Sequence, residues 1–141
     1  MYHQLSDNPT QDELRKYYEQ IHADAEAIMK RVWEVRGWTI KWDWHNGICD
    51  DCEFLYDSTG KCMGTKFGHI PQLIDAAAKI DELKLSVSHT KKSVKISNKH
   101  AEKPVEGKGR NLRLAYLDWL LAFETQLHEE KTCAAQSTNC L

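Results

Sequence analysis

The residues best placed to do chemistry lie in a basic segment in the last third of the 141-residue chain. The run Gly107-Lys108-Gly109-Arg110-Asn111 leads directly into an expected helix that carries Arg113 in its first turn. A helix N-terminus presents unpaired backbone N–H groups and a partial positive charge, and glycine lets a backbone approach an anion closely. This arrangement predicts a site for a phosphate group.

The basic character extends upstream into an expected hairpin at residues 83–96. Residues 91–113 contain eight Lys and Arg against two Glu, although the whole chain has a formal charge of -2. Such a local excess of positive charge can bind a polyanion. The alternative interpretation is a solvated, lysine-rich hairpin that protects a sheet edge from aggregation. The predicted ligand-binding residues are Lys91, Lys92, Lys95, Lys108, Arg110, Asn111 and Arg113.

Several familiar sites are not favoured by the sequence. No aromatic residues are interleaved with the basic ones, so stacking on single-stranded nucleic acid is not supported. The P-loop pattern Gly-x-x-x-x-Gly-Lys-Ser/Thr is missing, as are Gly-x-Ser-x-Gly, His-Glu-x-x-His and Gly-x-Gly-x-x-Gly. An enzyme is therefore the less favoured class.

A second candidate site is a cluster of cysteine and histidine. His45, Cys49, Cys52 and Cys62 lie within 18 residues, a spacing that permits a tetrahedral zinc site. If residues 48–56 form a regular strand, however, Cys49 and Cys52 point to opposite faces and cannot share a metal. Two alternatives stay open: small core thiols, and a redox dithiol whose thiol pKa the surrounding acids would raise.

The same region admits a harder cation. Asp43 and His45 are two residues apart on one face of an expected strand, with more acids close in sequence. Carboxylate oxygens and one imidazole can hold magnesium or manganese. This reading predicts a small metal-dependent hydrolase or nuclease, against the simpler view that these charges form the wet face of a sheet.

The elements that must position these residues follow from hydrophobic periodicity. A stripe with helical spacing runs from the capping signals at residues 8–13 to Gly37, and strict alternation follows from Trp38 to Trp44. The remaining expected elements are strands at 48–56 and 61–65, a helix at 70–81, a hairpin at 83–96, a mobile basic loop at 98–109 and a helix at 112–127. We therefore expect an α+β fold in which a long N-terminal helix and a C-terminal helix pack on an antiparallel sheet.

Composition sets the class of protein. With 41% hydrophobic and 28% charged residues, the chain is typical of one globular domain, expected over residues 1–131 with a flexible tail at 132–141. The absence of a long apolar stretch and of a signal-like N-terminus predicts a cytoplasmic protein without a membrane span. Five cysteines argue against a disulfide framework. Apolar residues on more than one face of 112–127 predict self-association as a dimer.

These observations lead to one expected function and two alternatives. We expect a small non-enzymatic binding protein that recognises a phosphate-bearing partner, either nucleic acid or a nucleotide-like ligand. The first alternative is a protein-interaction or inhibitor module that docks through the acidic and apolar helices. The second is the metal-dependent hydrolase or nuclease, and zinc is the one cofactor that the sequence brings forward.

Overall fold

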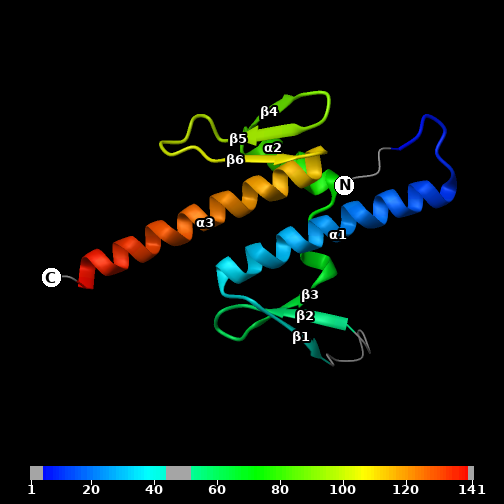
Figure 1. Cartoon of the computed structure of the whole chain (residues 1–141). Coiled ribbons are helices and arrows are strands. Elements are labelled where there is room, and N and C mark those ends of the chain that lie inside the picture. Colours follow the sequence, from blue (N-terminus) through cyan, green and yellow to red (C-terminus); the bar gives the residue numbers. More distant parts are fainter. Residues whose placement is uncertain (1–4, 44–51, 140–141) are drawn as a thin grey trace.

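The computed structural model describes residues 5–43 and 52–139 and confirms the α+β class. Two antiparallel three-stranded sheets take the place of the single sheet expected from the sequence. In Figure 1 the first sheet lies beside α1 and the second beside α3. In chain order the elements are α1 (Gln11–Arg36), β1 (Thr39–Asp43), β2 (Cys52–Tyr56), β3 (Cys62–Thr65), the 3-10 helix η1 (Phe67–His69), α2 (Leu73–Glu82), β4 (Ser86–His89), β5 (Val94–Ser97), β6 (Glu106–Gly109) and α3 (Leu112–Asn139).

The first helix begins and ends at the predicted signals. The Thr10 hydroxyl accepts a hydrogen bond from the Glu13 backbone N–H at 3.1 Å, which satisfies a donor that the helix itself cannot use. Gly37 ends α1 in the left-handed conformation with φ 78°, where glycine carries no steric penalty. The buried stripe of α1 consists of Ile21, Ala25, Met29, Val32 and Trp33.

The first sheet is the predicted meander, in the order β1-β2-β3. The expected aromatic face of β1 is only partly covered, because Trp38 is half-buried whereas Trp42 is 64% exposed. Asp57 shapes the turn between β2 and β3 by accepting hydrogen bonds from Thr59 and from the Lys61 backbone N–H. These bonds, led by that from the Thr59 hydroxyl, lower the pKa of Asp57.

Lys66 joins the first sheet to α1 electrostatically. Its Nζ lies 2.7 Å from Glu26 Oε1 on α1 and 2.8 Å from Glu53 Oε1 on β2, and the residue is buried. Burial by itself lowers the pKa of Lys66, but the hydrogen bonds to Glu26 and Glu53 outweigh it and raise that pKa. The hydrogen bond from Lys66 lowers the pKa of Glu26 against the opposing effect of burial. A buried ammonium is tolerated here because two carboxylates share it.

The second sheet has the order β4-β5-β6, and its last strand was not expected. The sequence predicts a mobile loop at 98–109, whereas Glu106–Gly109 pairs with β5 as strand β6. Because Lys108 lies on the edge of the sheet, its backbone N–H would lack a strand partner on that side. Asp118 Oδ2 on α3 accepts that N–H at 2.8 Å, so the helix covers the edge.

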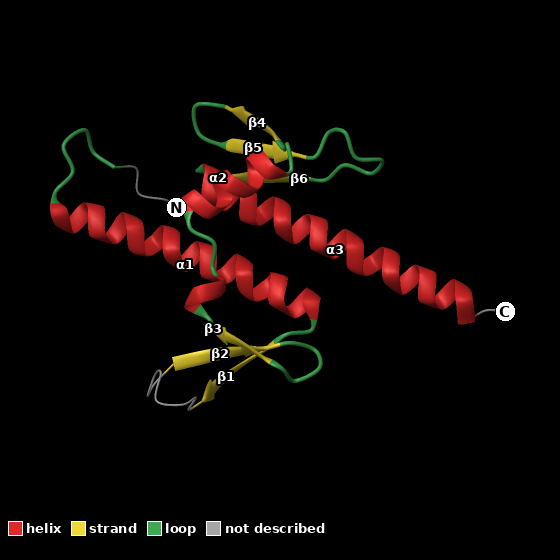
Figure 2. Ribbon diagram, turned by 180° about the vertical axis from the view of Figure 1, so that it is seen from behind, coloured by secondary structure: helices red, strands yellow, loops and turns green. Residues whose placement is uncertain are grey.

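The last helix is surrounded by the rest of the chain. It packs against α1, α2, β5 and β6, and Figure 2 shows α1 and α3 side by side. Leu114, Leu117 and Leu121 are all buried within one chain. Their spread over more than one face suggested a dimer, but intramolecular partners account for it. The helix also continues to Asn139, beyond the expected end at residue 127 and through most of the tail that was expected to be flexible.

Candidate nucleic-acid interface

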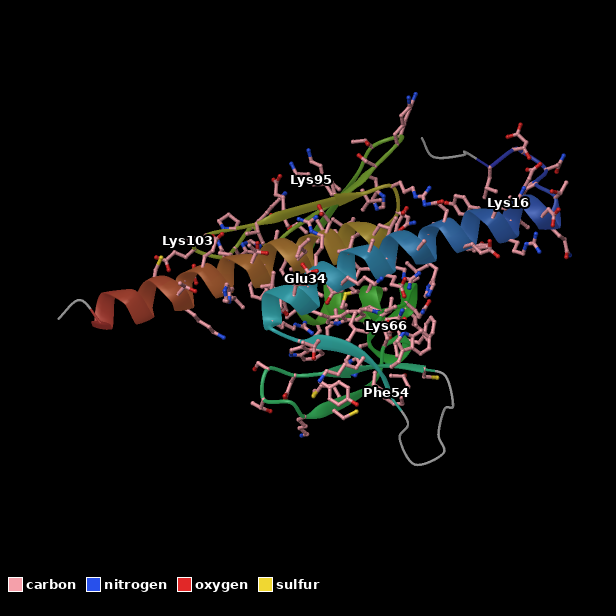
Figure 3. All side chains as sticks on the ribbon, turned by 60° about the horizontal axis from the view of Figure 1, so that its bottom comes forward. Lys16, Glu34, Phe54, Lys66, Lys95 and Lys103 are labelled. Carbon is pink, nitrogen blue, oxygen red and sulfur yellow. The ribbon has the colours of Figure 1, made fainter. Side chains whose placement is uncertain are left out.

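The second sheet covers α3 with one face and turns the other face to solvent. Cross-strand register places Ser88 opposite Lys95, and Lys95 opposite Lys108. The neighbouring row contains buried Ile96 and Gly107 and packs toward α3. Since side chains alternate along a strand, Lys95, labelled in Figure 3, and its cross-strand neighbour Lys108 lie on the outward face. Two expected ligand residues thus stand next to each other although they are 13 residues apart in sequence.

The two glycines before α3 serve packing rather than approach to an anion. A Cβ added at Gly107 would lie 2.1 Å from the Trp119 backbone N. A Cβ added at Gly109 would lie 2.4 Å from the Ala115 backbone N. Only glycine lets β6 lie this close to the backbone of α3. The sequence predicts that these glycines admit a phosphate, whereas their close contacts are with the backbone of α3.

Asn111 acts as the cap of α3. Its side-chain Oδ1 accepts a hydrogen bond from the Leu114 backbone N–H at 2.9 Å. This is the standard role of asparagine before a helix, and it occupies one of the donors that an anion would use. Asn111 thus has a partner within the chain, and its contact with a ligand stays a prediction.

Arg110 and Arg113 are also committed inside the protein. Arg110 Nη2 lies 3.0 Å from Asp24 Oδ2 on α1, and its guanidinium lies 5.7 Å from the centre of the Tyr17 ring. Arg113 is only 7% exposed, and its Nε donates to the Pro71 carbonyl at 2.7 Å. Burial lowers the pKa of Arg113, partly opposed by Asp75. A phosphate at the start of α3 would have to compete with these contacts.

The exposed cations instead spread along the second sheet. Lys91 and Lys92 lie in the turn between β4 and β5, which Thr90 and Ser93 close through hydrogen bonds. Lys95 Nζ lies 3.0 Å from Glu106 Oε1. We call the following six residues the basic sheet face: Lys91, Lys92, Lys95, Lys99, Lys103 and Lys108.

Sequence reasoning missed Lys99 and Lys103 as site residues. Both are exposed in the connection between β5 and β6. Gln126 on α3 anchors this connection by donating to the Lys103 carbonyl at 3.0 Å. Figure 3 shows Lys103 toward one end of the sheet, beyond Lys95. The charge count over 91–113 included both lysines, but without a periodic pattern nothing tied them to the sheet.

The predicted metal site is described only in part. His45 and Cys49 lie outside the described residues, as does the side chain of Asp43. Cys52 is disulfide-bonded, whereas the sequence predicts free thiols or metal ligands, and Cys62 is a free thiol. Cys62 pairs with Tyr56, at the opposite end of β2 from Cys52.

The register therefore keeps the two described cysteines apart. Tyr56 lies four residue steps along the strand from Cys52, or roughly 13 Å at the usual rise per residue. Zinc binds each sulfur at about 2.3 Å, so Cys52 and Cys62 cannot enter one coordination sphere in this arrangement. Over residues 5–43 and 52–139, no three His, Cys, Asp or Glu side chains gather in a way that could hold a metal ion. A site that includes His45 and Cys49 stays a prediction.

Comparisons with models of protein families, with curated proteins and with solved structures give no significant match. None of the helices described is long and apolar enough to cross a membrane.

Proposed function

We propose that the protein binds a nucleic acid along its phosphate backbone through the basic sheet face. The observation that carries this proposal is the adjacency of Lys95 and Lys108 on the solvent side of the sheet, with further lysines before and after them. Residues 84–108 contain seven Lys against two Glu, an excess that the total formal charge of -2 conceals. Lysine ammonium groups bind phosphates as point charges and need no particular base sequence.

A double-stranded partner fits this surface better than a single strand. Proteins that bind single strands stack bases on aromatic side chains. Residues 84–111 contain no Phe, Tyr or Trp. Binding through lysines and the Ser88 hydroxyl would instead follow the regular backbone of a duplex. The partner is extended rather than compact, because the groups that would hold a single nucleotide at the start of α3 are engaged within the chain.

Fluorescence anisotropy with labelled DNA and RNA duplexes tests the proposal. We expect log affinity to fall steeply with log salt between about 50 and about 200 mM. Lys95→Gln and Lys108→Gln should each reduce the magnitude of that slope by about one, as loss of one phosphate contact requires. Glu106→Gln should tighten binding, since it removes the carboxylate that competes for Lys95.

The matched control is Lys16→Gln, which removes an exposed lysine on α1, away from the sheet. It should leave the salt slope unchanged. If Lys16→Gln and Lys108→Gln lowered duplex affinity equally, binding would depend on net charge alone and not on the basic sheet face. No binding of either duplex at low salt would overturn the proposal.

A protein-docking function is the alternative that a specific observation supports. Leu73 and Ile74, in the first turn of α2, are 55% and 78% exposed, and Phe67 nearby in sequence is 64% exposed. Exposed apolar groups of this size occur at protein contacts. An apolar contact would depend weakly on salt, so the same titrations separate it from phosphate binding.

A further inference from the structure

A cleft of about 490 Å³ opens between α1, α2 and α3. Met29 and Ile70 contribute apolar walls, and Leu120 and Phe123 contribute the adjacent surface of α3. None of the lysines of the basic sheet face is among its lining residues. The volume is in the range of sites for small molecules. The cleft is thus separate from the surface proposed to bind nucleic acid.

Aromatic rings of α3 form one side of the cleft. The Tyr116 and Trp119 rings are 6.0 Å apart at an interplanar angle of 29°, and the Trp119 and Phe123 rings are 5.0 Å apart at 14°. All three residues line the cleft. A planar ring extends such a stack favourably, because offset parallel rings attract one another beyond the effect of buried area.

Trp119 also carries a hydrogen-bond donor that has no partner in the part of the chain that the structure describes. The residue is 2% exposed, and its indole Nε1 is buried without an acceptor among the described residues. Buried N–H groups in native proteins are almost always paired with protein, water or ligand. Because Trp119 lines the cleft, a ligand with an acceptor atom that reaches its indole would supply that partner.

The charged residues of the cleft favour an anion. Arg36 and Lys79 line it together with Asp75. Asp75 Oδ2 already accepts the Gln72 backbone N–H at 2.9 Å, as part of the cap of α2. Arg36 is paired with Glu124 at 2.6 Å, whereas the partner of Lys79 is the exposed Glu82 one helical turn away. Lys79 is therefore the cation that can most easily turn to a ligand.

Arg113 adds a positive charge near the cleft. Its Nε donates to the carbonyl of Pro71, which lines the cleft, and its Nη2 is buried without a partner among the described residues. Attraction to Asp75 opposes only part of the effect of burial on the pKa of Arg113. A negative group in the cleft would be attracted to that charge.

We propose that the cleft binds a small planar aromatic anion, such as an aromatic carboxylate. Its ring packs beside Leu120 and Phe123, its negative group faces Lys79, and an acceptor atom reaches the Trp119 Nε1–H. Tyr116 supplies a further neutral donor, because burial raises the pKa of its hydroxyl. The proposal does not depend on nucleic-acid binding, because the two surfaces use different residues.

Calorimetry with 2-naphthoate, and with the neutral 2-naphthamide as matched ligand, tests the proposal on the full chain. We expect naphthoate to bind more tightly than the amide. Lys79→Gln should weaken the binding of naphthoate by roughly threefold to fivefold, which is the effect of losing an ion pair at a half-exposed site. The same substitution should leave the affinity for 2-naphthamide unchanged. Lys131→Gln, near the far end of α3, serves as the control and should affect neither ligand.

Nuclear magnetic resonance distinguishes binding in the cleft from non-specific hydrophobic binding. Naphthoate should shift the Trp119 indole N–H signal downfield, as a new acceptor requires, and shift the Trp42 signal much less. Triple-resonance assignment identifies the signals without a tryptophan variant. An unchanged Trp119 signal, or equal affinities of naphthoate for wild type and Lys79→Gln, would overturn the assignment.

Discussion

Replacing Gly107 by alanine should separate the packing role of the glycine from a ligand role. The added Cβ would lie 2.1 Å from the Trp119 backbone N, 2.5 Å from its Cα and 2.6 Å from the Ala115 carbonyl oxygen. Real Cβ atoms essentially never approach closer than 3.0 Å. The atoms in the way belong to the backbone of a helix, which cannot rotate aside as a side chain can. Strand β6 must therefore move away from α3.

The cost follows from what that movement disrupts. Overpacking a core costs about 1 to 3 kcal/mol when side chains can adjust, so about 3 kcal/mol is the expected loss of unfolding free energy here. For a domain of this size, that loss lowers Tm by about 10 °C. Displacement of β6 would also weaken the hydrogen bond from the Lys108 N–H to Asp118.

Urea and thermal unfolding followed by circular dichroism measure this loss. Gly68→Ala is the matched control, because its Cβ would meet only the Thr65 hydroxyl at 3.4 Å and its φ lies outside the left-handed region. The unfolding free energy of this control should stay within about 0.5 kcal/mol of wild type, as it does for most surface changes. If Gly107→Ala were as stable as the Gly68→Ala control, the packing account of this glycine would be wrong. Unchanged stability with loss of binding would restore the phosphate-loop interpretation.

Three further outcomes are expected. The ion pairs around Lys66 contribute stability that is full at neutral pH. This contribution declines as pH falls through the lowered pKa of Glu26, and it also declines as pH rises through the raised pKa of Lys66. The stability curves of wild type and Glu26→Gln should therefore converge in acid. Asn111→Ala should cost about 1 kcal/mol in urea unfolding, and Asn111→Asp should retain most of that stability, since aspartate also caps helices. Arg110→Ala should lower Tm because it removes the ion pair with the partly buried Asp24, yet it should leave duplex affinity nearly unchanged in anisotropy.

Elements set by local patterns were predictable from the sequence. The stripe between Thr10 and Gly37 gives α1 within the observed bounds, because the cap, the periodicity and the stop signal all lie in one stretch. The meander β1-β2-β3 follows equally from alternation and turn residues. The α+β class needs only these local signals, which is why it was confirmed.

Strand β6 and the two arginines depend on distant partners, and the sequence alone does not reveal them. Residues 106–109 contain two glycines and no apolar residue, so neither propensity nor alternation indicates a strand. The strand exists because β5 pairs with it and α3 lies close beneath it. In the same way, Arg110 reaches Asp24 across 86 residues of sequence. The charge count therefore included cations that the fold uses internally.

The strand period decides which basic residues can reach a partner. Buried Val94 and Ile96 fix Lys95 on the opposite face of β5, and the contact of Gly107 with Trp119 fixes Lys108 in the same way on β6. Packing of the second sheet on α3 thus creates the lysine row as a consequence of filling the core. A variant that loosens β6, such as Gly107→Ala, should therefore weaken duplex binding along with stability. Lys108→Gln should weaken binding alone, and this difference separates the scaffold of the surface from the charges that it presents.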